Sequence, residues 1–340
     1  MRKEVKETAK GDGNIPSFYI EGKGVSDAFY KTLKVVHEKG MQLRTQYDRK
    51  DSDTDKFLDP PSRDAKVAVR VDDMFAKPSL PRMSYVQLGH YIAEMLGAKD
   101  HLVVPHAELF KLIHSGEAAK RVAEGGSEFE PKEWPYSYHK RLTEYPMSDG
   151  RTVNQLEMCV AKLTQDPITR RAVASTAVPE VDAFMASDAP CLRELEFRAI
   201  KDDQGRLVLN TTALWRSRDL YKAWCDNIVG LRNLIRFEVA LPLQEATGIP
   251  VVMGSYTEKN GSLHIYGQDD TQKGMNTFFK NNPTLEGFLE TTTNLQDPLR
   301  ENIVDELKEL AQDPTWNFPP ESIKIIEKTA QMFESREFDP

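Results

Sequence analysis

The sequence lacks the features of several common classes of protein. Cys159, Cys191 and Cys225 are its only cysteines, too few for a disulfide framework, and they form no C-x-x-C pair of the kind that holds zinc. No apolar run approaches membrane-spanning length, and the N-terminal MRKEVK segment lacks the apolar centre of a signal peptide. We therefore expect a protein of the reducing cytoplasm, with no membrane contact and no bound metal.

Positive charge is also in short supply. Lys and Arg number 45 against 53 Asp and Glu, which gives a formal net charge of −8. Polymeric nucleic acid is bound largely through Lys and Arg that displace counterions, so this balance argues against such a partner. Any phosphate held here should be a single group in a local arginine pocket. The phosphate-binding glycine loops, the Gly-x-Ser-x-Gly motif and the His-Glu-x-x-His zinc pattern are all absent.

What remains is the composition of an ordinary globular protein, with 39% apolar and 29% charged residues. Periodicity predicts helices over 25–37, 85–96, 108–122, 154–163 and 227–247, another beginning at 297, and a last one over 321–333. Alternation predicts strands over 66–71, 192–200, 207–214, 251–256 and 261–266, with turns at 149–150, 201–205 and 258–261. The aromatic and basic stretch 134–142 suits a strand rim or a pocket lip. We expect a mobile arm over 1–16, a main domain over 17–270 and a helical appendage over 271–340.

The clearest hairpin places two reactive residue types at its ends. Cys191 opens the first strand and Arg216-Ser217 closes the second, so an antiparallel register can bring these ends side by side. A thiolate is the nucleophilic form of cysteine, and nearby cations such as Arg170, Arg171 and Arg216 favour it. The alternative, an inert buried thiol, is the better reading of Cys191 from composition alone.

Two upstream residues allow two readings each. Arg63 lies where a polar loop meets a strand, as either a phosphate contact or a solvated loop arginine. Glu94 is surrounded in sequence by apolar helical residues, so it either reaches solvent or is buried for a purpose. Taken alone, each residue favours the structural reading.

A set of short motifs follows the order and the intervals of one known family. The set comprises Tyr138; Asp149-Gly150-Arg151 with Gln155; Asp166-Pro167 before Arg170-Arg171; Ala189-Pro190-Cys191 with Phe197; Arg216-Ser217-x-Asp219; Asn227; and Gly261-x-x-His264-x-Tyr266. By these motifs the chain resembles the thymidylate synthase superfamily, which includes the deoxycytidylate and cytidylate hydroxymethylases, from about Tyr138 to Tyr266. The resemblance implies an α+β fold with a mixed sheet flanked by helices.

The same resemblance implies a reaction and a role for each motif residue. Cys191 would add to C6 of a pyrimidine nucleoside 5′-monophosphate, so that C5 attacks the one-carbon unit of 5,10-methylenetetrahydrofolate. Glu94 and Tyr138 would move protons, and Asp219 would face the folate ring. Asn227 would bind the edge of the base, and His264 and Tyr266 would bind the sugar hydroxyl. The phosphate would be held by Arg63, Arg170, Arg171, Arg216 and Ser217, and because the family takes the adjacent arginine pair from the other subunit, a homodimer is implied.

The motifs leave the exact substrate and product open. An Asn at position 227 fits uracil, but Asp226 precedes it, and an Asp there fits cytosine better. Leu192, Glu196 and Trp215 depart from the residues usual in thymidylate synthases, and the apolar tail that closes those enzymes over folate is not recognisable in 335–340. We expect methylation of dUMP. The alternative is 5-hydroxymethylation of dUMP, dCMP or CMP, because without the closing tail water can reach the exocyclic methylene intermediate and convert it to hydroxymethyl. A second alternative is an inactive homologue that only binds a nucleotide.

Overall fold

The computed structural model describes residues 13–80, 87–129, 133–147, 149–185, 189–271 and 273–335, in two compact units. The first unit comprises 1–85, 215–225 and 257–296, and the second comprises 86–214, 226–256 and 297–340. Residues 1–12 of the expected N-terminal arm lie outside the described residues. The division of the remainder at residue 270 stays a prediction.

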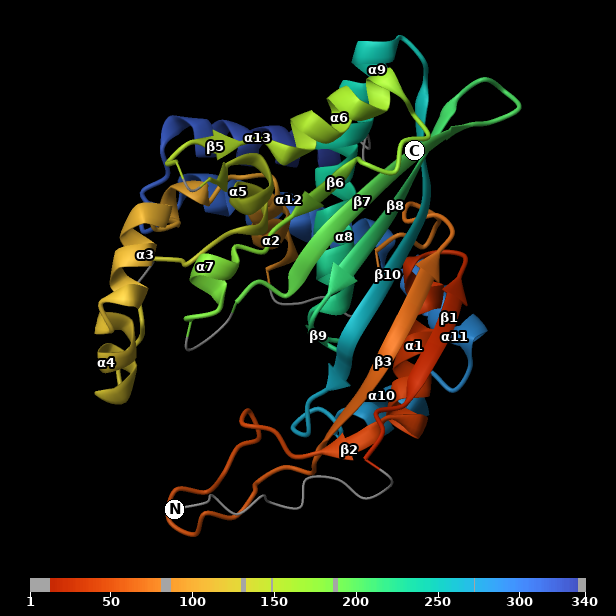
Figure 1. Cartoon of the computed structure of the whole chain (residues 1–340). Helices are drawn as coiled ribbons and strands as arrows, with labels where there is room; N and C mark the ends of the chain where they lie inside the picture. Colours follow the sequence, from red (N-terminus) through yellow and green to blue (C-terminus); the bar gives the residue numbers. More distant parts are fainter. Residues whose placement is uncertain are drawn as a thin grey trace. The chain divides into compact units, whose positions relative to one another are not determined.

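The first unit is built on the strand order β1-β3-β10 (Figure 1). β1 runs parallel to β3, short β2 runs antiparallel to β3, and short β9 runs parallel to β10. Its strands and helices are β1 (Ser17–Gly22), α1 (Val25–Lys39), β2 (Met41–Leu43), β3 (Ser62–Val71), β9 (Arg218–Asp219), the second part of β10 (Val251–Ile265), α10 (Met275–Asn281) and α11 (Leu285–Thr293).

Aromatic rings form the core of this unit. The ring of Phe29 on α1 lies 6.1 Å from Trp224, 6.3 Å from Phe278 of α10 and 6.1 Å from Phe288 of α11. Such pairs bury large apolar areas in preferred offset or edge-on arrangements. The helix expected over 25–37 is thus confirmed, and its apolar stripe is the face that meets α10 and α11.

In the second unit the strand order is β10-β8-β7-β6, with β6 antiparallel to β7. Its strands are β4 (Tyr145–Pro146), β5 (Thr152–Val153), β6 (Val173–Ser175), β7 (Leu192–Lys201), β8 (Leu207–Trp215) and the first part of β10. Its helices are α2 (Leu88–Met95), α3 (His106–His114), α4 (Glu117–Ala123), α5 (Tyr138–Thr143), α6 (Gln155–Gln165), α7 (Pro179–Asp182), α8 (Trp224–Ile235), α9 (Leu241–Thr247), α12 (Gln296–Gln312) and α13 (Pro320–Glu334), with a 3-10 turn at Asp100–Leu102 and a π-helical turn at Arg236–Ala240.

The mixed sheet with flanking helices confirms the α+β class, and most expected elements are present. The β7–β8 hairpin turns at 202–205 as predicted, and Asn154 caps α6 by accepting from the N–H of Glu157. The helix expected over 85–96 is present as α2, although 85 and 86 are not described. Within the described residues, no helix is long and apolar enough to cross a membrane.

One expected helix was wrong, and two other segments differ in detail. The helix expected over 108–122 is two helices, because Gly116 takes the left-handed conformation, with φ of 76°, between α3 and α4. The stretch 134–142, expected at a strand rim or a pocket lip, holds helix α5 and not a strand, and Tyr136, Lys140 and Arg141 line a pocket, as the second reading expected. The helix expected over 227–247 begins earlier, at Trp224, and passes through a π-helical turn before α9, where Pro242 supplies no N–H donor.

The expected turn at 258–261 is also wrong, because β10 runs unbroken from Val251 to Ile265. Polar composition suggested a turn, yet Glu258 is fully buried and its carboxylate accepts from Arg218 Nη1 at 2.5 Å and from Trp224 Nε1 at 2.6 Å. Asn260 donates to the same carboxylate at 2.8 Å and to the carbonyl of Val67 on β3 at 3.2 Å. The Glu258 carboxylate and the amide N–H groups of Asn260 thus find partners inside the protein, so the strand continues through them.

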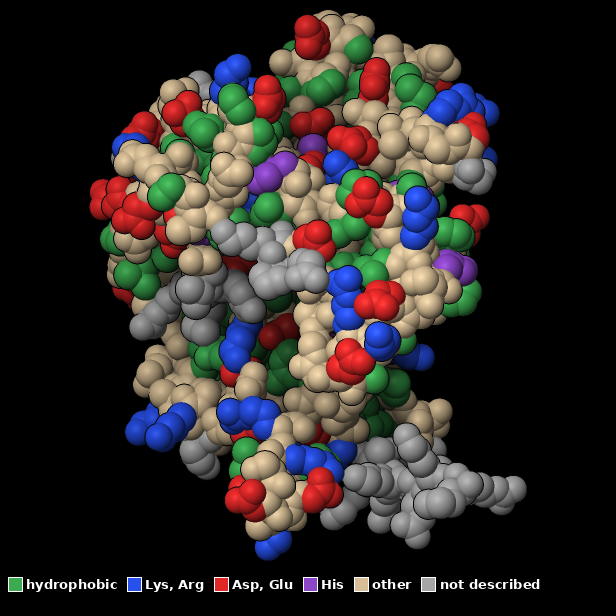
Figure 2. All heavy atoms as spheres, turned by 90° about the vertical axis from the view of Figure 1, so that its left-hand side faces the viewer, with side chains coloured by type: hydrophobic (Ala, Val, Ile, Leu, Met, Phe, Trp, Pro, Cys, Tyr) green, Lys and Arg blue, Asp and Glu red, His purple; other side chains and the backbone are tan. Residues whose placement is uncertain are grey.

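Charges of both signs are present on one face of the molecule. On the face shown in Figure 2, acidic and basic side chains are interspersed rather than gathered by sign. This arrangement accords with the modest net charge of −8 and offers no continuous basic track.

Candidate active site

Cys191 lies directly before β7 in the second unit and is half-buried, with its sulfur in no disulfide. The backbone on both sides of it is held by hydrogen bonds. The carbonyl of Pro190 accepts from Arg193 Nη1 at 3.3 Å, and the hydroxyl of Thr176 donates to the carbonyl of Leu192. The thiol therefore projects from a fixed strand end and not from a mobile loop.

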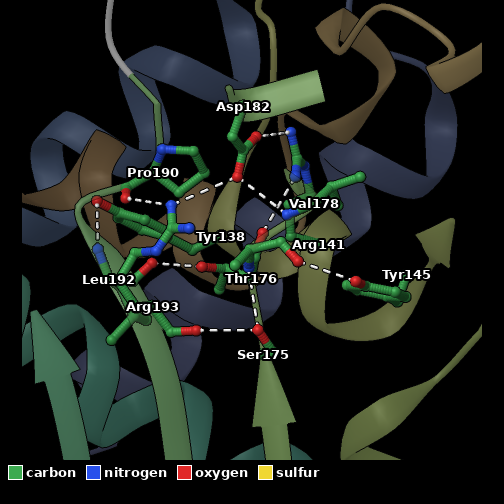
Figure 3. A network of polar contacts seen from close by, with 11 residues as sticks. Tyr138, Arg141, Tyr145, Ser175, Thr176, Val178, Asp182, Pro190, Leu192 and Arg193 are labelled. Carbon is green, nitrogen blue, oxygen red and sulfur yellow. Dashed lines mark hydrogen bonds and ion pairs between the residues drawn. The ribbon is translucent and has the colours of Figure 1, made fainter. Parts of the chain in front are cut away.

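A buried ionic network stands behind this segment. Arg141 and Arg193 converge on the carboxylate of Asp182, at 3.0 and 3.4 Å (Figure 3). Arg141 also donates to the carbonyl of Thr176 at 3.1 Å, and the other oxygen of Asp182 accepts from the N–H of Val178 at 2.9 Å. Charge-assisted bonds of this kind are among the stronger ones in proteins. The network joins α5, the end of β6 and α7 to the start of β7.

Tyr138 is the first residue of α5, and its hydroxyl oxygen accepts from the N–H of Leu192 at 3.5 Å. The start of the helix is fixed by Ser137, whose hydroxyl oxygen caps the N–H of Lys140 and whose proton goes to Asp100. His139 Nδ1 lies 2.6 Å from the other oxygen of Asp100. The structure thus brings Tyr138 to the residue next to Cys191.

Glu94 lies in the last turn of α2, half-buried in the second unit. Burial raises the pKa of its carboxyl to about 7, an effect that the positive charge of Lys99 opposes and the negative charge of Asp100 reinforces. A carboxyl of this pKa exchanges protons at neutral pH, as a general acid or base must. The reading of Glu94 as a solvated surface carboxylate does not fit this environment.

Asn227 lies in the first turn of α8, and its side-chain amide donates to the hydroxyl of Tyr91 on α2 at 2.8 Å. α2 and α8 approach closely here: a Cβ added to Gly230 would lie 2.8 Å from Tyr91 and from Met95. Asp226 is only 2% exposed, whereas Asn227 is half-buried. Of the two neighbours, Asn227 has the better access to a ligand.

Arg170 and Arg171 are both exposed and precede β6. The carbonyl of Ala172 accepts from the N–H of Phe197, six residues along β7 from Cys191. At about 3.3 Å per residue, the arginine pair lies roughly 20 Å along the strand from the thiol. The structure does not bring these two arginines to the cysteine of the same chain.

In the first unit, His264 lies on β10 opposite Asp219 of β9. Its Nδ1 is 3.3 Å from the hydroxyl of Ser262, which donates to Asp64 at 2.8 Å. Burial lowers the pKa of His264 to about 4, so the ring is neutral at pH 7. With Asp64 ionised, Ser262 accepts from Nδ1–H, and Nε2, which has no partner among the described residues, is left as an acceptor.

Asp219 is half-buried beside this histidine. Its Oδ1 accepts from the N–H groups of Tyr221 and Lys222 at 2.9 and 3.0 Å, which fixes the carboxylate at the end of β9. Burial raises the pKa of Asp219 to about 6, although these two hydrogen bonds oppose the shift. Tyr266 lies close by, with its ring 4.6 Å from that of His264 in an edge-on contact. Asp219, His264 and Tyr266 therefore form one cluster.

The remaining expected phosphate ligands also lie in the first unit. Arg63 is the second residue of β3 and pairs with Asp270 at 2.8 Å, and Asp270 also contacts His37 at 2.8 Å. Arg216 is exposed just after β8, and Ser217 next to it is half-buried. Arg63 is thus held in place by a carboxylate, and Arg216 is the more accessible cation of the two.

Sequence reasoning missed the residues that support the site. Arg141 and Asp182 gave no signal, because an ion pair across 41 positions has no sequence period. Tyr91 was not singled out in the sequence, although its hydroxyl accepts from the side-chain amide of Asn227. Periodicity predicted the helix that begins near Asn227 and the family motifs singled out Asn227 itself, but no signal in the sequence pointed to Tyr91 as its partner.

Comparison with known proteins agrees with the motifs. The family model for thymidylate synthase matches residues 128–339, more than half of the chain. A "Putative thymidylate synthase" of Methanocaldococcus jannaschii is 34% identical over 139 residues, which are 40% of this chain and 57% of that protein. One of the same description from Methanococcoides burtonii is 25% identical over 252 residues, 74% of this chain and 90% of that protein.

Among solved structures, the thermostable thymidylate synthase A from Bacillus subtilis aligns with 78% of this chain and 84% of its own, at 18% identity and a TM-score of 0.48. The family model covers the segments that carry Tyr138, Cys191 and His264, whereas Arg63 and Glu94 precede it. On the strength of that match, the chain belongs to the thymidylate synthase family, whose members are one-carbon transferases.

Proposed function

We propose that this protein transfers a one-carbon unit from 5,10-methylenetetrahydrofolate to C5 of a pyrimidine nucleoside 5′-monophosphate, with methylation of dUMP as the favoured reaction. The observation that carries the proposal is the fixed position of Cys191. Its flanking peptides are bound by Arg193, Thr176 and Tyr138, so the thiol is held in place before any substrate arrives.

The chain's own residues have the chemistry that such a reaction needs. The Cys191 thiolate adds to C6 of the base, and the added electron density makes C5 nucleophilic. After C5 has formed its new bond, C5 loses its proton to a general base. We assign this step to Tyr138, whose hydroxyl oxygen accepts from the N–H of Leu192. Glu94, whose carboxyl has a pKa of about 7, gives a proton to the carbonyl oxygen of the pyrimidine ring and takes it back.

Nucleotide binding is assigned to residues from several elements. The neutral ring of His264 and the hydroxyl of Tyr266 suit a sugar hydroxyl, because Nε2 accepts and the phenol can donate. Arg216, Ser217 and Arg63 suit the phosphate, although Arg63 already pairs with Asp270. Asn227 suits a uracil edge, which presents both an acceptor and a donor to its amide.

Reduced folate is a co-substrate in this proposal. When bound, it supplies the one-carbon unit and, for methylation, the hydride that reduces it. The residue assigned to it is Asp219, whose backbone hydrogen bonds fix a carboxylate able to accept from N–H groups of a pterin ring.

The position of Arg170 and Arg171 supports a dimeric enzyme. They are exposed and about 20 Å along the β6–β7 pair from the cysteine of their own chain. A second copy of the chain could use them as phosphate ligands.

Two inactive variants, Cys191→Ser and Arg170→Ala/Arg171→Ala, should then regain activity when they are refolded together. One of the two sites in the mixed dimer has the intact cysteine of one chain and the intact arginine pair of the other. No recovery would contradict the shared site.

The decisive experiment incubates the purified protein with methylenetetrahydrofolate and dUMP, UMP, dCMP or CMP and identifies the products by mass. We expect dTMP and dihydrofolate from dUMP. A hydroxymethylated nucleotide with tetrahydrofolate would establish the alternative reaction. Saturable nucleotide binding without any product would show a catalytically inactive homologue.

Cys191→Ser should abolish tritium release from a 5-tritiated substrate, and unchanged release would overturn the covalent mechanism.

A further inference from the structure

Lys99 is a lysine in an unusual environment. It follows α2 by four residues and is only 5% exposed. In the part of the chain that the structure describes, it forms no ion pair with a carboxylate. Lysines are rarely buried this far without a partner, since their charge loses its hydration.

Two indole rings take the place of an ion-pair partner. The Nζ of Lys99 lies 4.5 Å from the ring centre of Trp316 and 5.6 Å from that of Trp134. An ammonium within about 6 Å of an aromatic face is attracted by the negative charge of the π system, most strongly for Trp. The rings hold the cation in place without neutralising it, whereas a carboxylate would cancel its charge.

Lys99 stays close to Glu94 because the chain folds back at the end of α2. The N–H groups of Gly97 and Ala98 donate to the carbonyls of Glu94 and Ala93, each at 2.9 Å, so the segment that carries Lys99 is held against the last turn of the helix. Burial raises the pKa of Glu94, and the charge of Lys99 opposes that effect; in return, Glu94 opposes the lowering that burial imposes on the pKa of Lys99. Each group thus favours the ionised form of the other.

We propose that Lys99, held between Trp134 and Trp316, is a positioning residue whose charge sets the protonation of Glu94. This inference rests on the proton-transfer role proposed above for Glu94. Lys99 itself need not touch the nucleotide, because its effect passes through the carboxyl.

The charged groups on neighbouring elements do not duplicate this effect. Asp100, next to Lys99, raises the pKa of Glu94 and is itself tied to Ser137 and His139 of the α5 segment. On α12, Glu306 accepts from the N–H of Gly89 at 2.8 Å, at the opposite end of α2. On α8, the charged residues nearest to Gly230, where that helix meets α2, are Asp226 and Arg232, and both are buried. α13 also packs on α2, and it carries Glu321, Lys324, Glu327 and Lys328.

His90, also on α2, senses the charge of Lys99 as well. Burial lowers its pKa, and the charge of Lys99 lowers it further. His90 is therefore neutral at pH 7 and adds no positive charge beside Glu94. Of the groups that act on Glu94, Lys99 is the one that favours its ionised form.

Trp316 connects the C-terminal helices to the surroundings of Lys99. Trp316 lies between α12 and α13 and stacks on Phe318, with ring centres 5.9 Å apart. Its other neighbours are His90, at 6.4 Å, and the ammonium of Lys99. The segment after residue 297 thus supplies one wall of the lysine site.

The test measures the Glu94 carboxyl directly, in the substrate-free full-length protein. Infrared difference spectra are recorded against pH, and Glu94→Gln identifies the Glu94 band. Lys99→Met keeps the length of the side chain and removes its charge, so we expect the midpoint of the band to rise by about 1 pH unit. Lys99→Arg keeps the charge and should restore a midpoint near that of the wild type. An unchanged midpoint in Lys99→Met would overturn the proposal.

Trp316 supplies a second test that does not depend on Lys99→Met folding. Trp316→Leu removes the ring, so the ammonium is hydrated and its field at Glu94 weakens; the midpoint should rise, by less than in Lys99→Met. Trp316→Phe keeps an aromatic face and should stay near the wild type. A fall of the midpoint in Trp316→Leu would show that this ring only excluded water from the carboxyl, and would overturn its role in holding Lys99.

The kinetic readout separates this inference from the proposed function. If the enzyme is active, one limb of the plot of kcat against pH should report the ionisation of Glu94. That limb should move with the infrared midpoint, while the KM for nucleotide stays near the wild-type value. If the protein makes no product but the midpoint still moves, the proposed function fails and the Lys99 effect stands. A kcat limb that stays fixed while the midpoint moves would remove the catalytic meaning of the pair.

Discussion

Arg141 and Asp182 form an ion pair at 3.0 Å in which both side chains are almost fully buried. The pair joins α5 to α7, and through Arg193 it reaches the carbonyl of Pro190 beside Cys191. Removing one partner would leave the other charge buried without compensation, which costs far more than a surface pair contributes.

We expect Asp182→Ala to lower the free energy of unfolding by about 3–5 kcal/mol, measured by urea denaturation at pH 7. The matched control is Asp149→Ala, which breaks the exposed pair with Arg151 and should cost about 0–1 kcal/mol. Equal losses in the two variants would show that the buried network is not a main source of stability.

Tyr138→Phe should slow the reaction without weakening nucleotide binding. Loss of the hydroxyl removes a proton-transfer group, so kcat should fall by about 10²–10⁴-fold, while the KM changes little. Steady-state rates and tritium release both measure this. Tyr145→Phe removes another hydroxyl of the same network, one that donates to the carbonyl of Ala177, and should leave kcat within a few-fold. A rise in KM alone for Tyr138→Phe would assign Tyr138 to binding.

Stability should depend on His264 at mildly acidic pH. The folded state holds its pKa near 4, below the ordinary value of 6.5, so the unfolded chain binds more protons between these values. Stability contributed by the neutral ring is therefore present above pH 6.5 and is lost as the pH falls toward 4, by at most about 3 kcal/mol.

Urea unfolding at pH 5 and pH 7 tests this. His264→Gln should show a smaller difference between the two pH values than the wild type does. His114→Gln replaces an exposed histidine and should keep the wild-type difference. If His264→Gln also keeps it, the acid sensitivity comes from other groups.

Asn227 should decide between uracil and cytosine. Asn227→Asp replaces an amide that can donate and accept with a carboxylate that only accepts, which suits the amino group of cytosine. We expect the ratio of kcat/KM for dCMP over dUMP to rise by about 10–100-fold, as for a single exchanged hydrogen bond of 1–3 kcal/mol. Asp226→Asn is the control for the neighbouring position. A larger change in that variant would make Asp226 the base reader.

Particular elements show where sequence reasoning succeeded. The β7–β8 hairpin and the cap of α6 were predictable because their signals are local: alternating apolar residues around a polar turn, and an Asn before an amphipathic run. The turn expected at 258–261 failed for the converse reason. Glu258 and Asn260 look like turn residues in the sequence. In the structure Glu258 accepts from Arg218 and Trp224, and Asn260 donates to Glu258 and to the carbonyl of Val67, so both lie in the interior.

The site divides in the same way. Sequence alone determined the family motifs, and through them the α+β class and the residues proposed to carry the chemistry, because residue type and spacing along a chain are local facts. The tertiary structure alone decided their surroundings. It placed the Arg141–Asp182 pair behind Cys191, Tyr91 against Asn227, and two indole rings around Lys99. Burial and partners depend on elements far apart in sequence, and these set the pKa of a carboxyl and the orientation of an amide.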